Sequence, residues 1–110
     1  MNSFMLRKQP MDRYVKMIEG VSRNTLVHGD KTVLCKFMLD GGAVLPLHSH
    51  PYEQTGYMLS GKMLFTIDGE KHEVAAGDSW CIKADVEHGA EVLEDTLVIE
   101  VFSPVREDYL

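Results

Sequence analysis

The chain has 110 residues, of which 45% are hydrophobic and 25% are charged, and its formal net charge at pH 7 is −6. This length and composition are typical of one globular domain with its own hydrophobic core, so we expect a single domain over residues 1–110. The acidic balance argues against a nucleic-acid partner, and the apolar runs are too short for a membrane span. The first residues do not resemble a secretory leader, and a cytoplasmic location is expected.

Residues 1–20 are expected to form an N-terminal arm, with a short helical turn within residues 10–19. Beyond the arm, short apolar and β-branched runs alternate with turn signals, which predicts β-strands. The nine predicted strands cover residues 21–27, 32–39, 44–50, 54–59, 62–67, 70–75, 79–82, 88–93 and 96–102. Tight turns are predicted at Ser60-Gly61, Asp68-Gly69 and Glu94-Asp95. So many short strands with little helical periodicity predict an all-β sandwich or barrel.

The two cysteines, Cys35 and Cys81, both fall within predicted strands. Cysteines in apolar strands are commonly buried, and a disulfide is rare in the expected compartment. We therefore expect both to be reduced core thiols rather than a disulfide pair.

Three histidines and a glutamine form the most informative pattern of the chain. His48, His50 and Gln54 follow one another closely, and His88 comes much later. Strand side chains repeat every second residue, so His48 and His50 are expected to point the same way. In a barrel, alternate residues line the interior, where Gln54 and His88 can join them. Three imidazoles with one oxygen ligand predict a divalent transition metal (Mn, Fe, Co, Ni, Cu or Zn) rather than Ca²⁺ or Mg²⁺.

These residues resemble the two sequence motifs of the cupin family. The first motif is matched by Gly42, His48, His50, Gln54 and Gly61, and residues 77–88, which close on His88, are similar to the second. The resemblance implies a jelly-roll barrel of short antiparallel strands. It also implies that His48, His50, Gln54 and His88 are metal ligands.

The glutamine at position 54 stands where the commonest cupin motif has a glutamate. All four ligands are then neutral, so a bound divalent metal keeps its full charge and favours an anionic ligand. Glu53 is an alternative ligand, because Pro51 interrupts the strand and with it the alternation of side chains.

The C-terminal segment resembles that of the pectin-degradation cupins, which open the ring of 4,5-unsaturated uronate monosaccharides to the linear keto acid. In that family an acidic residue, a phenylalanine and an arginine line the pocket beside the metal, and Glu100, Phe102 and Arg106 match them by position. Here a glutamate stands in place of the expected aspartate. Glu100 is suited to moving a proton, and Arg106 to binding a substrate carboxylate. The alternatives are that Phe102 is a core residue and Arg106 part of a solvated tail.

Together these observations predict a metal-dependent enzyme that opens or isomerises the ring of an unsaturated uronate, a small carboxylated sugar. The same ligands equally permit a metal-dependent dioxygenase of a small enol or aromatic substrate. A non-catalytic module that binds a small ligand is the third alternative. The expected partners are a small anionic substrate and a second copy of the chain, with residues 4–6 adding as a strand to the sheet of a homodimer partner.

Overall fold

The structure is a computed structural model that describes residues 3–8 and 13–110. Within this part of the chain there are eight strands and one short 3₁₀ helix. They are β1 (Val15–Ile18), β2 (Val21–His28), β3 (Val33–Leu39), β4 (Val44–His48), β5 (Glu53–Ile67), β6 (Glu70–Ala75), β7 (Ser79–Ile82), β8 (His88–Ser103) and η1 (Glu107–Tyr109). No helix among the described residues is long and apolar enough to cross a membrane.

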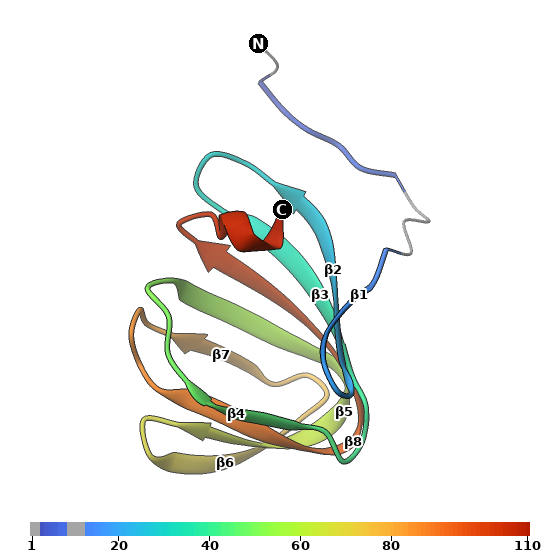
Figure 1. Cartoon of the computed structure of the whole chain (residues 1–110), viewed down its shortest axis with the longest axis vertical. Coiled ribbons are helices and arrows are strands. Elements are labelled where there is room, and N and C mark those ends of the chain that lie inside the picture. Colours follow the sequence, from blue (N-terminus) through green and yellow to red (C-terminus); the bar gives the residue numbers. More distant parts are fainter. Residues whose placement is uncertain (1–2, 9–12) are drawn as a thin grey trace.

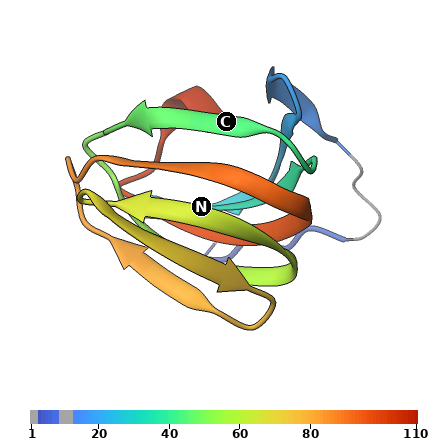
Figure 2. The ribbon, with the colours of Figure 1, turned by 90° about the horizontal axis from the view of Figure 1, so that it is seen from below.

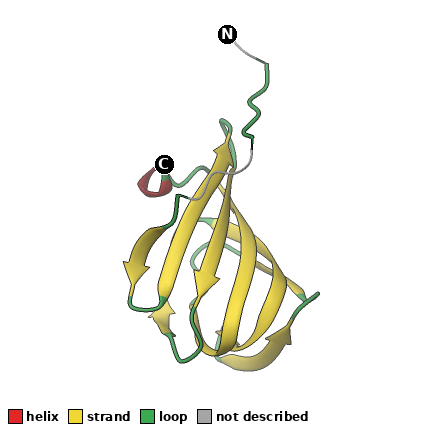
Figure 3. Ribbon diagram, turned by 90° about the vertical axis from the view of Figure 1, so that its right-hand side faces the viewer, coloured by secondary structure: helices red, strands yellow, loops and turns green. Residues whose placement is uncertain are grey.

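The strands form one antiparallel sheet that curls around a central interior (Figures 1 and 2). Its order is β1-β2-β3-β8-β5-β6, while β4 pairs with β8 and β7 pairs with β5. The long strand β8 pairs with β3, β4 and β5, and the long strand β5 pairs with β6, β7 and β8, so these two strands join the halves of the sheet. Figure 3 shows the curled sheet from another side. The predicted all-β barrel is confirmed.

Two of the three predicted tight turns are wrong, because β5 and β8 each run through without interruption. Ser60-Gly61 lies inside β5, and Glu94-Asp95 lies inside β8. The register shifts at this point of the β5–β8 pairing, and Gly61 has a φ of 101°. A Cβ atom at Gly61 would lie 2.5 Å from the backbone oxygen of Asp95. The glycine is therefore required by a β-bulge and a close strand approach, not by a turn.

The irregular middle of β5 determines which of its residues face the interior. Before it, the buried residues are even-numbered, such as Gln54 and Met58, and after it they are odd-numbered, such as Met63 and Phe65. Because side chains alternate along a strand, one extra residue exchanges the two faces. The bulge thus allows a single long strand to supply a polar residue at one end of the interior and apolar ones further along it.

The other predicted elements mostly agree with the structure. The bounds predicted for β6 and β7 are confirmed, and the hairpin at Asp68-Gly69 has the positive φ values, 50° and 80°, that a primed turn requires. The helical turn predicted in the N-terminal arm is wrong for residues 15–18, which form β1, and residues 9–12 lie outside the described part. Residues 3–8 are described and carry no strand. Their pairing with a second copy stays a prediction.

The core lies between the two halves of the curled sheet. Its most deeply buried side chains are those of Val33, Cys35, Met58, Ile82 and Val98. Burial of each larger one stabilises the fold by about 2 kcal/mol. Cys35 is a free core thiol as predicted, but the prediction for Cys81 is wrong: on β7, Trp80 and Ile82 face inward and Cys81 is free and exposed.

Candidate metal centre

The four predicted ligands come together at one end of the barrel. His48 ends β4, Gln54 lies near the start of β5, and His88 opens β8. The strand predicted to reach His50 ends two residues earlier, yet His50 still turns inward. The ring centroids are 4.3 Å apart for His48 and His88, 4.9 Å for His50 and His88, and 5.8 Å for His48 and His50. One ring nitrogen from each histidine lies within 4.8 Å of the others, which is close enough for a shared metal ion.

Backbone carbonyl groups determine which nitrogen of each ring carries the hydrogen. Each Nδ1 lies at hydrogen-bonding distance from a carbonyl two residues away: Pro46 for His48 (2.8 Å), Tyr52 for His50 (3.0 Å) and Val86 for His88 (2.9 Å). A carbonyl oxygen only accepts, so in the neutral ring Nδ1 is the donor and Nε2 keeps its lone pair. This is the tautomer that binds a metal through Nε2 while an outer partner holds the ring.

Burial keeps two of these rings uncharged near neutral pH. Desolvation, the main cause, lowers the pKa of His88 to about 4, and desolvation also lowers the pKa of His50. A histidine must be neutral to bind a metal. Neither ring therefore has to lose a proton first.

The side chain of Gln54 supplies the fourth donor atom. Its Nε2 donates to the Glu100 carboxylate, which directs its Oε1 toward His50, where Oε1 and the ring Nε2 are 2.7 Å apart. With the tautomer above, both of these atoms present lone pairs, and two acceptors this close repel each other unless a cation lies between them. The donor set therefore fits a divalent metal. Gln54 is 4% exposed, whereas Glu53 points to the outer face, so the structure does not support Glu53 as the ligand.

The carboxylate of Glu100 lies behind Gln54, inside the barrel. It accepts hydrogen bonds from Gln54 Nε2 and from Trp80 Nε1, the latter at 3.1 Å. Desolvation raises the pKa of Glu100 to about 7, although both hydrogen bonds act in the opposite direction. A carboxyl group with this pKa can both accept and release a proton near neutral pH.

Trp80 and Gly56 belong to this site, and neither was predicted as part of it. Trp80, Gly56 and Glu100 are paired in one row across β7, β5 and β8. A Cβ atom at Gly56 would lie 2.6 Å from Cζ2 of Trp80, so only a glycine there lets the indole reach across β5 to Glu100. A glycine inside a strand is a known sign of such a close approach, but the partner is visible only once the register is known.

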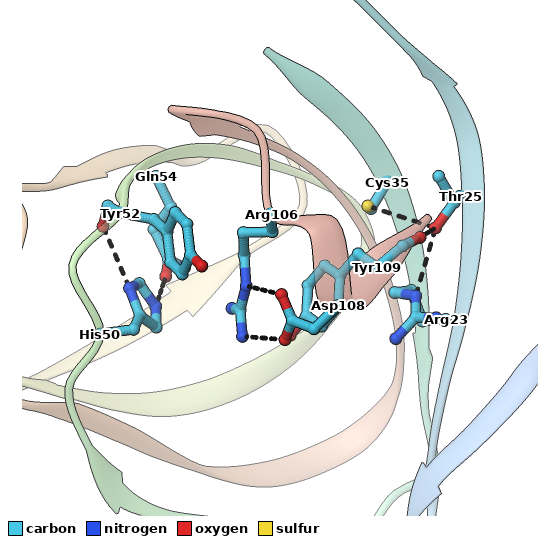
Figure 4. Close-up of polar contacts among 9 residues, drawn as sticks. All are labelled: Arg23, Thr25, Cys35, His50, Tyr52, Gln54, Arg106, Asp108 and Tyr109. Carbon is cyan, nitrogen blue, oxygen red and sulfur yellow. Dashed lines mark hydrogen bonds and ion pairs between the residues drawn. The ribbon is translucent and has the colours of Figure 1, made fainter. Parts of the chain in front are cut away.

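Arg106 follows β8 and enters the same cavity instead of extending into solvent. Its guanidinium carbon lies 3.8 Å from the ring centroid of Tyr109, 4.9 Å from that of Tyr52 and 5.1 Å from that of Phe102 (Figure 4 shows Arg106 with both tyrosines). Phe102 is 2% exposed, so it is a core residue and a cavity wall at once. The alternative that Arg106 belongs to a solvated tail is therefore wrong, because its side chain is only 13% exposed.

The cavity that contains these groups has a volume of about 330 Å³. The histidines, Gln54, Glu100 and Arg106 line one part of it. The rest is apolar and includes Val21, Phe37, Leu39, Met63, Phe65 and Val98. Val21 pairs with Leu39 at the far end of β3, away from the end that faces Phe102 and the ligands. The cavity thus has a polar end and an apolar end.

Comparisons with known proteins agree with this architecture. The family model described as the cupin domain matches residues 35–103. The pectin degradation protein KdgF of Dickeya dadantii (strain 3937) is 29% identical over 94 residues, which cover 84% of this chain and 86% of that protein. The structure of KdgF from Halomonas sp. superposes with a TM-score of 0.84 at 33% identity, covering 89% of this chain and 91% of that one. An RmlC-like cupin from Shewanella frigidimarina NCIMB 400 superposes with a TM-score of 0.85 at 30% identity, covering 89% and 88%. The barrel is therefore a jelly roll, and the chain belongs to the cupin family.

Proposed function

We propose that this protein is a metal-dependent enzyme that opens the ring of an unsaturated uronate, a small carboxylated sugar. The observation that carries the proposal is the presence of a proton carrier, Glu100, and a guanidinium, Arg106, in one cavity with a neutral set of metal ligands. The likeness to two proteins named KdgF, one of them a pectin degradation protein, supports the same substrate class. Pectin is a polymer of uronates.

His48, His50, His88 and Gln54 are the residues that would hold the metal. A bound divalent metal would act as a Lewis acid toward the oxygen atoms of the sugar. Because none of the four ligands carries a charge, its positive charge is not reduced by the protein. This favours a substrate with anionic oxygen.

Arg106 and Glu100 have separate roles in the proposed reaction. The guanidinium of Arg106 binds the substrate carboxylate and so fixes the orientation of the ring. Glu100 accepts the proton of the anomeric hydroxyl while the bond between the anomeric carbon and the ring oxygen breaks, which leaves an aldehyde and an enolate. Glu100 then returns the same proton to the carbon end of the enolate, which becomes the ketone, and the linear keto acid forms without net gain or loss of protons.

The test is to incubate the metal-loaded protein with an unsaturated uronate and to follow the loss of the conjugated double bond by absorbance. The product is identified by NMR. Acceleration over buffer that disappears on chelation of the metal supports the proposal, and no acceleration with any of the six candidate metals contradicts it. Oxygen uptake is recorded in parallel with small enols and catechols, because a dioxygenase with the same ligands would consume oxygen with these substrates.

A further inference from the structure

The guanidinium of Arg106 pairs with a carboxylate from η1. Besides the three rings around it, the carboxylate of Asp108 in η1 accepts two hydrogen bonds from its guanidinium. Nε donates to Oδ1 at 3.3 Å, and Nη2 donates to Oδ2 at 2.9 Å. The side chain of Arg106 is 13% exposed and that of Asp108 is 53% exposed, so the pair lies at the border of the cavity.

This pairing uses only one edge of the guanidinium. The group has five N–H bonds, and Asp108 takes the one on Nε and one of the two on Nη2. The other edge, formed by Nη1 and the second N–H of Nη2, can still donate two parallel hydrogen bonds to a carboxylate. In Figure 4, Asp108 lies on one side of Arg106, while His50 and Gln54 lie on the opposite side.

Asp108 does not itself occupy the cavity. Arg106, Phe102 and Tyr109 line the cavity wall, and Asp108 is not among the lining residues. Two contacts fix the helix η1 to β2. Thr25 Oγ1 donates to the backbone oxygen of Tyr109, and the guanidinium of Arg23 lies 4.3 Å from the Tyr109 ring centroid. Asp108 is thus attached to the barrel wall on the outer side of the arginine.

We propose that Asp108 is a positioning residue that holds the outer edge of Arg106, so that the inner edge faces the cavity and binds the carboxylate of the ligand. The inference rests on the proposed function only for the class of ligand, a monocarboxylated sugar. An arginine side chain that moves freely before binding loses conformational entropy when it binds a ligand. An arginine whose far edge is already held loses less. Asp108 therefore improves carboxylate binding without touching the ligand.

The test measures binding, not turnover. Protein loaded with Zn²⁺ or Ni²⁺ is titrated by calorimetry with galacturonate, a saturated uronate, and with its uncharged methyl ester. Asp108→Ala is expected to weaken galacturonate binding about fivefold, as for a half-exposed ion pair, and to leave the ester and the metal affinity unchanged. Asp108→Asn keeps one acceptor oxygen, and its affinity for galacturonate is expected to lie between those of Asp108→Ala and the unchanged protein.

Glu107→Ala is the matched control, because Glu107 is an exposed acid of the same helix and its side chain has no partner among the residues that the structure describes. It is expected to bind galacturonate like the unchanged protein. The inference is overturned if Asp108→Ala binds galacturonate as well as or better than the unchanged protein. It is also overturned if Asp108→Ala weakens the ester equally, or if the unchanged protein does not prefer galacturonate to its ester. A protein that binds galacturonate in this way but does not open an unsaturated uronate contradicts the proposed function and leaves the role of Asp108 intact.

Discussion

The polar and the apolar ends of the cavity are built on different principles. At the polar end, directional hydrogen bonds hold the side chains: His50 donates to the backbone oxygen of Tyr52, and Gln54 and Trp80 donate to Glu100. At the apolar end, Val21 and Leu39 are held by close packing alone. The difference shows that the chemistry and most of the stability of this barrel are located in different residues, since hydrogen-bonded groups add little net stability and packed ones add much. Substitutions at the two ends should therefore affect different measurements.

The largest effect is expected for Glu100→Gln, at the polar end. The amide keeps the size of the side chain and can still accept from Trp80, but it cannot transfer a proton. We expect the rate of uronate ring opening to fall by a factor of about 100 or more, while the metal affinity and the unfolding midpoint change little. Absorbance kinetics and thermal unfolding of the same preparation measure both. A variant that keeps full activity would remove Glu100 from the mechanism.

At the apolar end, Leu39→Ala should lower stability and not metal binding. Leu39 is 3% exposed, and its truncation leaves a void that costs about 3 kcal/mol of unfolding free energy. Leu59→Ala serves as the control, because Leu59 is 43% exposed on the outer face and should lose much less. Urea unfolding of metal-free protein gives the values. If metal affinity fell as much as stability, the separation of the two ends would be wrong.

His48→Ala should lower metal affinity and leave stability almost unchanged, because His48 is exposed although it is a predicted ligand. Loss of one of four donors is expected to lower metal affinity by a factor of about 100. The unfolding free energy of the metal-free protein should change by less than about 0.5 kcal/mol. Equilibrium dialysis with Zn²⁺ measures the affinity, and His72→Ala, at an exposed histidine on β6, is the control. Equal affinities for the two variants would exclude His48 from the metal site.

The smallest effect is expected for Gly56→Ala, in the strand between Trp80 and Glu100. The new methyl group collides with the indole of Trp80, and relief of the overlap should cost about 1–2 kcal/mol. It should also move the indole away from Glu100. Because Trp80 is the single tryptophan of the chain, its fluorescence reports the displacement directly. An unchanged emission spectrum would mean that the strands adjust instead of the side chain.

The sequence predicted which residues come together at the candidate metal centre more accurately than it predicted the strands that carry them. His48, His50 and Gln54 are close in sequence, so even a wrong end for β4 left them together. The turns at Ser60-Gly61 and Glu94-Asp95 were predicted wrongly for a physical reason. A glycine with positive φ serves a turn and a bulge equally well, and only the pairing of β5 with β8 distinguishes the two.

The contacts of Trp80 and Asp108 could not be predicted from the sequence, because they depend on strand register and on where another side chain lies in the fold. The path from Trp80 across Gly56 to Glu100 requires three strands to be aligned. Asp108 is an acid in a short, polar C-terminal segment, and no local pattern distinguishes it from Glu107. Only the folded position of Arg106 does so.

Because backbone carbonyls hold the three imidazoles, the candidate metal centre tolerates substitution of the side chains next to it. The acceptors belong to Pro46, Tyr52 and Val86, but each contributes only its main-chain oxygen. Any amino acid at these positions supplies the same oxygen, provided that the backbone keeps its path. Substitution of their side chains therefore leaves the tautomers intact, and Tyr52, which also contacts Arg106, is free to vary with the ligand. A library randomised at these positions should yield metal-binding proteins with altered ligand preference at high frequency.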